Sequence, residues 1–279
     1  MELWYSLLNY ILPFQWLEFG FMKNALLAIL LVSPIFGLAG TMVVNNRMAF
    51  FSDAIGHAAL TGIAIGVLLG LGSPMWAMLA FSVLLAVLIS WAHIKTEASP
   101  DTVIGVFFAT AVALGIVVLS RQGGFNKYSK YLIGDLLSIT PGEIVLLLLV
   151  LLVVLALWVL VFNKLFLVSF NPAVARSRRI NTFVMETAFA VVIAMVVTVS
   201  IQWVGILVIN SLLILPAAAA RNIGSSMRSY TLTAVLISFI SGITGLVLSY
   251  YWETATGATI VLCAFACYVL TVIIKGVRN

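Results

Sequence analysis

Residues 46–66 read NRMAFFSDAIGHAALTGIAIG, an apolar run that follows a basic residue and carries an aspartate and a histidine near its start. These two residues, Asp53 and His57, are four positions apart and therefore share one face of a helix. Ionisable side chains near a membrane interior are costly, which makes them candidates for function. Because carboxylate and imidazole groups both bind transition metals, the pair predicts a metal-contacting face.

The same pair has a structural alternative. Ser52 or Asp53 would cap the N-terminus of this helix, where a carboxylate is also favourable, and His57 would be an interfacial residue. Two side chains also fall short of the roughly four ligands of a metal site. Any further ligands would come from elsewhere in the fold or from a second copy of the chain.

The composition excludes an ordinary soluble domain. Mean hydropathy is +1.21 and charged residues make up 8% of the chain, against about 25% in soluble domains. Five runs without ionisable side chains approach or reach the ~20 residues that cross a bilayer as a helix. They are Asn24–Asn46, Thr102–Ser120, Ile144–Asn163, Ser229–Trp252 and Thr254–Ile274.

Two longer runs are each long enough for two passes. Ala58–Ala92 is interrupted at Gly70–Pro74, and Thr187–Ala220 is interrupted at Gln202–Gly205. The sequence therefore predicts an all-α polytopic membrane protein with about nine transmembrane helices, eight and ten being the alternative counts.

The charge distribution predicts the orientation. With the N-terminus outside and the C-terminus inside, the inner loops hold ten of the 14 Lys and Arg residues, as membrane topology requires. This distribution among loops also argues against a nucleic-acid partner for the net charge of +5. We expect residues 1–279 to form a single membrane-embedded domain. Residues 1–20, interrupted by Pro13 and Glu18, would form an interfacial segment.

Catalytic motifs are missing from the sequence. It contains no G-x-x-x-x-G-K-[ST] phosphate loop, and two histidines at positions 57 and 93 cannot form H-E-x-x-H. We therefore expect a transport subunit without a permanently bound cofactor, with any ATP hydrolysis on a separate subunit.

Other residues carry weaker expectations. A stripe of small residues, which includes Gly62, Gly66 and Gly70, predicts close packing of a neighbouring helix. Asp135 in an outer loop could receive a cation, and Asn210 within a span could line a path or bond between helices. His93 is explained by a solvated inner loop beside Lys95, and Glu186 receives no role.

Four blocks of the sequence resemble the membrane permeases of bacterial zinc/manganese ABC importers. The block quoted above resembles that family's G-D-x-x-x-H-A-x-L-x-G-x-A segment, and KYLIGDLLSITPGEI resembles its Y-L-F-G-D-[IL]-L segment. VGILVINSLLILPAAAAR and TGATIVLCA resemble two further family blocks, in the same order.

The resemblance implies a type II ABC importer permease fold in the bacterial cytoplasmic membrane. It implies a homodimer of permeases that works with a cytoplasmic ATPase dimer and an extracytoplasmic metal-binding protein. Asp53 and His57 fall on the family's acidic and histidine positions, expected to contact the metal in transit, and Asp135 falls on a further acidic position. Transport would proceed by alternating access, with zinc favoured over manganese as cargo.

The resemblance also implies that an inner loop within residues 164–181 docks into the ATPase. FNPAVARSRR resembles the family pattern F-D-x-x-x-A-x-x-x-G. Phe170 and Ala175 match this pattern, and Arg176 lies within it. Asn171 replaces the usual acid, and Arg179 stands where glycine is common.

Two alternatives remain open at this point. A secondary transporter or channel that works without ATP would need several carboxylates at mid-span, which the long charge-free runs disfavour. A purely structural membrane scaffold would leave Asp53, His57 and the basic inner loop unexplained.

Overall fold

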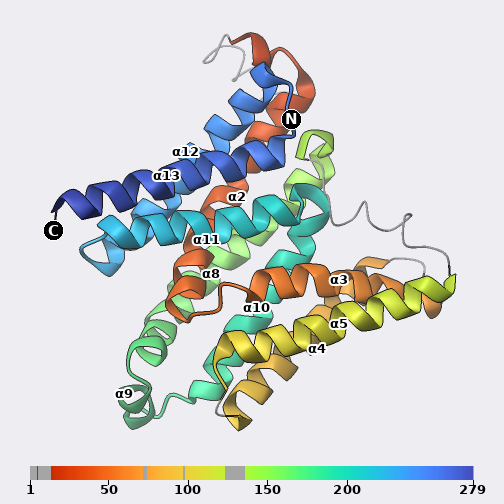
Figure 1. Ribbon diagram of the computed structural model, residues 1–279, viewed down its shortest axis with the longest axis vertical. Helices are drawn as coiled ribbons and strands as arrows, with labels where there is room; N and C mark the ends of the chain where they lie inside the picture. Colours follow the sequence, from red (N-terminus) through yellow and green to blue (C-terminus); the bar gives the residue numbers. More distant parts are fainter. Residues whose placement is uncertain (1–4, 6–13, 72–73, 97, 123–135, 279) are drawn as a thin grey trace. The chain divides into compact units, whose positions relative to one another are not determined.

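A computed structural model describes residue 5 and residues 14–71, 74–96, 98–122 and 136–278 (Figure 1). Over these residues the chain is helical, with short connections. The helices are η1 (Gln15–Leu17), α2 (Gly20–Asn45), α3 (Phe51–Leu68), α4 (Pro74–Lys95), α5 (Pro100–Gln122), η2 (Leu136–Ser138), α8 (Pro141–Phe170), α9 (Pro172–Ser177), α10 (Thr182–Val204), α11 (Ile206–Ile223), α12 (Met227–Trp252) and α13 (Thr256–Arg278).

Nine helices in the described part of the chain are long and apolar enough to cross a membrane, which confirms the predicted count. Both predicted interruptions fall between helices. The first lies between α3 and α4. The second is Gly205, whose φ of 85° is a left-handed conformation that separates α10 from α11. The predicted interfacial segment 1–20 lies largely outside the described residues.

The chain forms two compact units. Unit 1 comprises residues 1–41, 135–156 and 203–279, and unit 2 comprises residues 42–134 and 157–202. Whether residues 1–279 act as one membrane domain stays a prediction.

In unit 1, helices α11, α12 and α13 pack against one another. Small residues allow this packing: a Cβ placed on Gly245 of α12 would lie 2.5 Å from the Cα of Ile260 in α13. Ala219, Ala220 and Ala234 form a fully buried cluster between α11 and α12. In lipid, the surroundings are as apolar as the helix side chains, so the hydrophobic effect does not drive helices together. They associate through close van der Waals packing, which small residues make possible.

In unit 2, helix α3 packs against both α4 and α5, and the three run side by side (Figure 1). A Cβ on Gly62 would lie 2.7 Å from the Cα of Met78, and one on Gly66 would lie 2.6 Å from the Cβ of Ala77. On the other side of α3, the Thr61 hydroxyl donates to the Ala111 carbonyl oxygen of α5 at 2.6 Å. Helix α3 is thus fixed between two neighbours.

The third glycine of the stripe, Gly70, serves the predicted interruption at Gly70–Pro74 and not the predicted helix packing. Gly70 lies beyond the end of α3 with φ of 68°, and a Cβ there would meet no atom of the described residues within 4 Å. Its amide donates to the Val67 carbonyl, and the Leu71 amide donates to the Gly66 carbonyl at 2.9 Å. This is the Schellman end of a helix, so Gly70 makes the turn and does not pack a neighbour.

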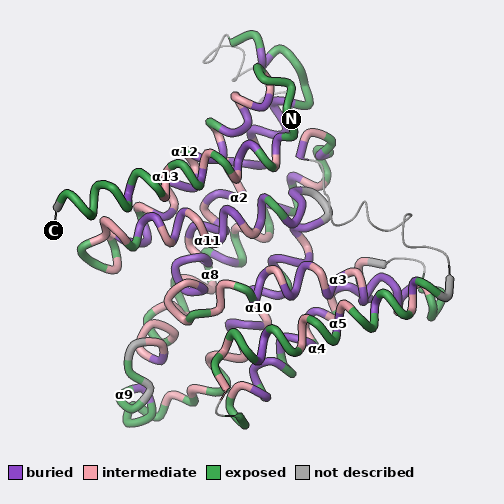
Figure 2. Tube along the Cα trace, in the orientation of Figure 1, coloured by how far each residue is buried: buried purple, intermediate pink, exposed green. Residues whose placement is uncertain are grey.

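Burial differs strongly among the spans (Figure 2). In their most apolar stretches α2 and α3 bury 67% of their residues, whereas α8 buries 17% and α13 22%. Apolar side chains such as Leu149, Val159 and Leu160 stay exposed along α8. A helix that is apolar on its exposed face fits contact with lipid, as expected for a membrane-embedded chain.

Candidate metal-binding site

Asp53 and His57 lie in the first two turns of α3. The N-cap residue is Phe50, so neither Ser52 nor Asp53 occupies the cap position that the structural alternative required. Ser52 is instead fully buried. The Asp53 carboxylate is still favoured by its place in the first turn, where the helix dipole is positive. The capping interpretation of the pair is therefore wrong, although the pair does sit at a helix N-terminus.

The two side chains are in contact. The Nδ1 atom of His57 lies 3.0 Å from the backbone carbonyl oxygen of Asp53 and 3.4 Å from its Oδ1 atom. A carbonyl oxygen only accepts hydrogen bonds, so the closer contact is favourable when Nδ1 carries the proton. In the neutral ring this leaves the lone pair on Nε2, which is the atom that would bind a metal.

Both side chains remain reachable. The exposed fractions are 36% for the side chain of His57 and 40% for that of Asp53. The His57 ring packs edge-to-face on Phe108 of α5, with ring centroids 5.6 Å apart. This contact, together with the Nδ1 hydrogen bond, restricts the ring orientation without covering it.

A cavity of about 160 Å³ lies beside His57, between α3 and α5. Its lining is apolar apart from His57 and Thr61, and the Thr61 hydroxyl already donates to Ala111. His57 is therefore the polar group that this cavity offers to a cation.

The two other predicted pathway residues, Asp135 and Asn210, belong to unit 1. Asp135 lies outside the described residues, and Asn210 lies on α11 in unit 1, whereas Asp53 and His57 belong to unit 2. Across the part of the chain that the structure describes, no group of three or more His, Cys, Asp and Glu side chains gathers around one point. The pair thus supplies an incomplete ligand set, and Asp135 and Asn210 stay predictions.

The predicted coupling segment forms the short helix α9. The Oδ1 atom of Asn171 accepts from the Val174 amide at 3.1 Å and caps this helix. Asparagine and aspartate cap about equally well, so the departure from the family's acid keeps the cap. Ala175 is fully buried, whereas Arg176 is exposed. The Phe170 side chain lies outside the described residues.

Arg179 follows α9 with φ of 58°. The Ile180 amide donates to the Ala175 carbonyl at 3.0 Å, and the Arg179 amide donates to the Arg176 carbonyl at 2.9 Å, which is again a Schellman end. This geometry explains why glycine is common at the position in the resembling family: the turn demands a left-handed residue.

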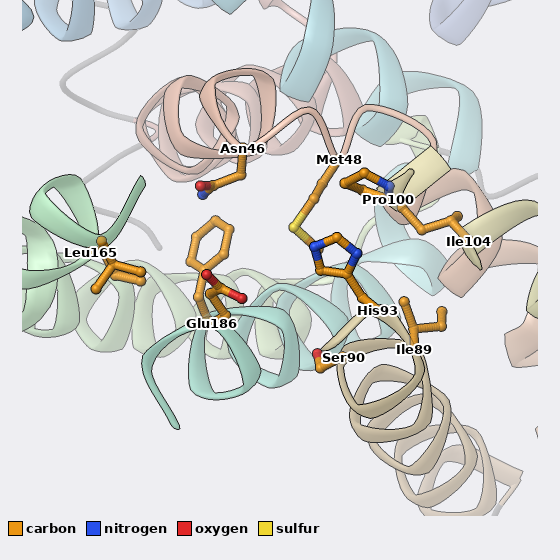
Figure 3. A pocket seen from close by; sticks show the side chains of 11 residues that line it. Asn46, Met48, Ile89, Ser90, His93, Pro100, Ile104, Leu165 and Glu186 are labelled. Atoms are coloured by element: carbon orange, nitrogen blue, oxygen red, sulfur yellow. The ribbon is translucent and has the colours of Figure 1, made fainter. Parts of the chain in front are cut away.

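One polar pocket was missed by the sequence reasoning. His93 does not lie in a solvated loop, because it belongs to the last turn of α4 and lines a cavity together with Glu186 of α10 (Figure 3). The neighbouring charges of the 95–101 segment made His93 look solvated. A usable signal was present nonetheless, since nine spans put the end of one helix and the start of the other on the same side of the membrane.

Comparison with known proteins agrees with the architecture. The model of the ABC 3 transport family matches residues 18–275. The chain is 31% identical over 254 residues to the high-affinity zinc uptake system membrane protein ZnuB of Haemophilus influenzae, covering 91% of this chain and 97% of that protein. It is 29% identical over 249 residues to the manganese transport system membrane protein MntC of Listeria innocua, covering 89% and 88%. A chain of the structure of PsaBC from Streptococcus pneumoniae in complex with Fab superposes with a TM-score of 0.78 at 25% identity, covering 97% and 95%. Because the family model spans most of the sequence, the chain belongs to the ABC 3 transport family.

Proposed function

We propose that the chain is the permease subunit of an ATP-driven importer that moves a divalent transition metal across the bacterial cytoplasmic membrane by alternating access. One observation carries the proposal: the His57 imidazole is held through Nδ1 beside the Asp53 carboxylate, and both side chains stay reachable at the start of α3. The similarity to proteins named for zinc uptake and manganese transport supports it.

Zinc is the preferred cargo in this proposal, with manganese next. Imidazole and carboxylate ligands suit both ions, and the general order of affinities favours zinc. Two ligands from α3 hold the ion less firmly than a closed four-ligand site would. An ion in transit must bind well enough to enter and weakly enough to leave, so an incomplete shell suits a transport path.

The partners follow from the family. A second copy of the chain would complete the pathway, a cytoplasmic ATPase dimer would dock around α9, and an extracytoplasmic protein would deliver the metal. The N-terminus would lie outside and the C-terminus inside. Movement of α9 on ATP binding would reorient unit 2, which carries both α9 and the Asp53/His57 pair.

The proposal is tested by uptake of radioactive zinc and radioactive manganese, measured separately, in cells that express the chain with its ATPase and binding protein. We expect His57→Ala and Asp53→Ala to abolish uptake of the cargo metal, because each removes one of the two ligands supplied by α3. Leu68→Ala, at an exposed position at the far end of α3, is the matched control and should transport normally.

Membrane abundance of each variant is measured alongside uptake. Normal uptake by both ligand variants would refute the site. Uptake that persists when the ATPase carries an inactivating substitution of its phosphate-loop lysine would refute the ATP-driven mechanism and favour a secondary transporter.

A further inference from the structure

A second pocket, lined by several side chains with donor atoms, lies at the end of unit 2 where α9 is attached. It has a volume of about 90 Å³ and is formed by the ends of α4 and α8, the starts of α5 and α10, and the turn after α2. Most of its lining is apolar, including Ile89, Ile104 and Leu165. A cavity needs about 10–15 Å³ by this measure to hold one water molecule, so this one has room for an ion together with several waters.

The side chains that could bind a ligand through a nitrogen, oxygen or sulfur atom come from separate segments of this pocket. His93 projects from α4 and Glu186 from α10, while Asn46 and Met48 belong to the turn that follows α2. In Figure 3, His93 and Met48 project into the pocket from one half of the view, and Glu186 and Asn46 from the other half. The His93 imidazole and the Glu186 carboxylate line the same pocket.

The local helix ends fix this arrangement. The turn after α2 is closed by the Arg47 amide, which donates to Val44, and by the Met48 amide, which donates to the Val43 carbonyl at 3.0 Å. The Asn45 side chain also donates to the Ser169 hydroxyl of α8 at 2.6 Å. The segment that carries Asn46 and Met48 is therefore anchored to the helix that precedes α9.

One nitrogen of the His93 imidazole is buried without a hydrogen-bond partner in the described structure. Its Nδ1 atom is buried and has no hydrogen-bond partner among the described residues. Buried polar atoms in proteins are hydrogen-bonded in the large majority, so an exception calls for a cause. A carboxylate and an imidazole in a mostly apolar pocket also form a site where a cation offsets the cost of burying charge.

The donor atoms specify the chemistry of the ligand. An imidazole nitrogen and a carboxylate oxygen suit zinc, manganese and iron as divalent ions, and the amide oxygen of Asn46 adds a further donor of the same kind. The thioether of Met48 is a softer ligand that a zinc ion accepts more readily than a manganese ion. The combination describes a small site for a divalent transition metal with open positions for water.

We propose that His93 and Glu186, assisted by Asn46 and Met48, form a second binding site for a divalent transition metal, separate from the Asp53/His57 pair. That this ion is the cargo rests on the proposed function. In the proposed orientation α3 begins on the cytoplasmic side, so this site lies toward that side together with Asp53 and His57. The site would hold the ion after it leaves Asp53 and His57, and movement of α9 would open it.

The direct test is spectroscopic and uses cobalt(II) as the probe, on the purified full-length chain in lipid nanodiscs. The background carries Cys263→Ser and Cys267→Ser, which removes both native thiols. In this background we expect His93→Cys to give an intense thiolate-to-cobalt charge-transfer absorption, because the new sulfur would replace an imidazole ligand. The neighbouring Ile94→Cys, at an exposed position of α4, is the matched control and should give none.

A merely structural contact between α4 and α10 would not produce this absorption. A well-folded His93→Cys protein that binds cobalt without the charge-transfer band would overturn the proposal.

Zinc stoichiometry, measured by equilibrium dialysis, gives an independent test that does not depend on introducing a thiol. We expect His93→Gln and Glu186→Gln each to bind one zinc ion fewer per chain than the wild type, and the double variant to lose no more than either alone. His57→Gln should lose a zinc ion bound at the other site, so the His57→Gln/His93→Gln double variant should lose two zinc ions per chain.

The two proposals fail separately. Unchanged zinc binding in both His93→Gln and Glu186→Gln would overturn the second site. Loss of zinc only in these variants, with His57→Gln unaffected, would uphold the second site and contradict the Asp53/His57 pair as a metal site.

Discussion

Arg179 shows how one backbone angle governs a functional loop. Its φ of 58° places a side chain-bearing residue in the left-handed region, at a cost of roughly 1–2 kcal/mol. The same angle closes the Schellman end of α9, so the residue cannot relax without releasing the turn. The strain is therefore stored beside the predicted ATPase-docking segment.

We predict that Arg179→Gly raises the stability of the purified chain by roughly 1 kcal/mol, because glycine adopts this angle without the steric cost. Thermal unfolding in detergent measures the change. Arg178→Gly is the control: Arg178 has φ of −86°, so glycine brings no relief there and a stability gain equal to that of Arg179→Gly would contradict the explanation.

A second residue-scale prediction concerns Asn171. Asn171→Ala removes the acceptor of the Val174 amide and should destabilise α9 by about 1 kcal/mol, whereas Asn171→Asp should keep the cap. If α9 is the docking helix, the alanine variant lowers the amount of metal imported per ATP hydrolysed in the reconstituted complex. If the alanine and aspartate variants import equal amounts of metal per ATP hydrolysed, the cap would not be needed for the function of the loop.

Among the helices, α3 is the element on which the site depends. It carries Asp53 and His57 on one side and is held against α4 through Gly62 and Gly66. The ligands can therefore keep their geometry only as long as this packing persists. Helices in lipid associate by such close contacts, and an added side chain forces the pair apart.

We predict that Gly62→Val destabilises the chain by about 1–3 kcal/mol, the usual cost of overpacking, and lowers metal uptake because α3 shifts. The branched side chain would collide with the Met78 backbone. Gly105→Val on α5 is the matched control, since a Cβ there meets no atom within 4 Å. Stability measurements that rank the two variants equally would show that the α3–α4 contact is not decisive.

The helices themselves were largely predictable from the sequence, because a bilayer imposes a simple rule of length and charge. The runs without ionisable residues gave nine spans, and Gly205 marked the break between α10 and α11. The break at Gly70–Pro74 was also predicted, but the four-residue spacing wrongly assigned Gly70 to the packing stripe as well. His93 was misjudged because its charged neighbours Lys95 and Asp101 suggested a solvated loop, whereas Lys95 ends α4, Asp101 lies in α5, and His93 itself lines a pocket.

At the scale of the whole molecule, membership of the ABC 3 transport family makes the chain a transport subunit, and in this family ATP hydrolysis belongs to a separate subunit. The resemblance seen in four sequence blocks is thereby confirmed. The Asp53/His57 contact was predictable because residues four apart on a helix must meet. Whether Asn210 and Asp135 contribute to the site stays a prediction, because it depends on tertiary placement that no local spacing encodes.

The orientation gives a prediction for the complete chain. In a background without native cysteines, a membrane-impermeant maleimide should label Leu71→Cys in intact spheroplasts and should label Ser177→Cys only after permeabilisation. Both positions are exposed, so access is set by the side of the membrane alone. The reverse pattern of labelling would contradict the N-out, C-in orientation.

The length of α8 has a mechanical consequence. Its charge-free part, from Ile144 to Asn163, rises about 30 Å and so matches the hydrocarbon thickness, while Lys164 to Phe170 add about 10 Å beyond it. In the proposed orientation, we therefore expect the end of α8 to carry α9 beyond the hydrocarbon layer on the cytoplasmic side. A force that a partner applies to α9 would then be transmitted along α8 into the membrane-spanning part of the chain.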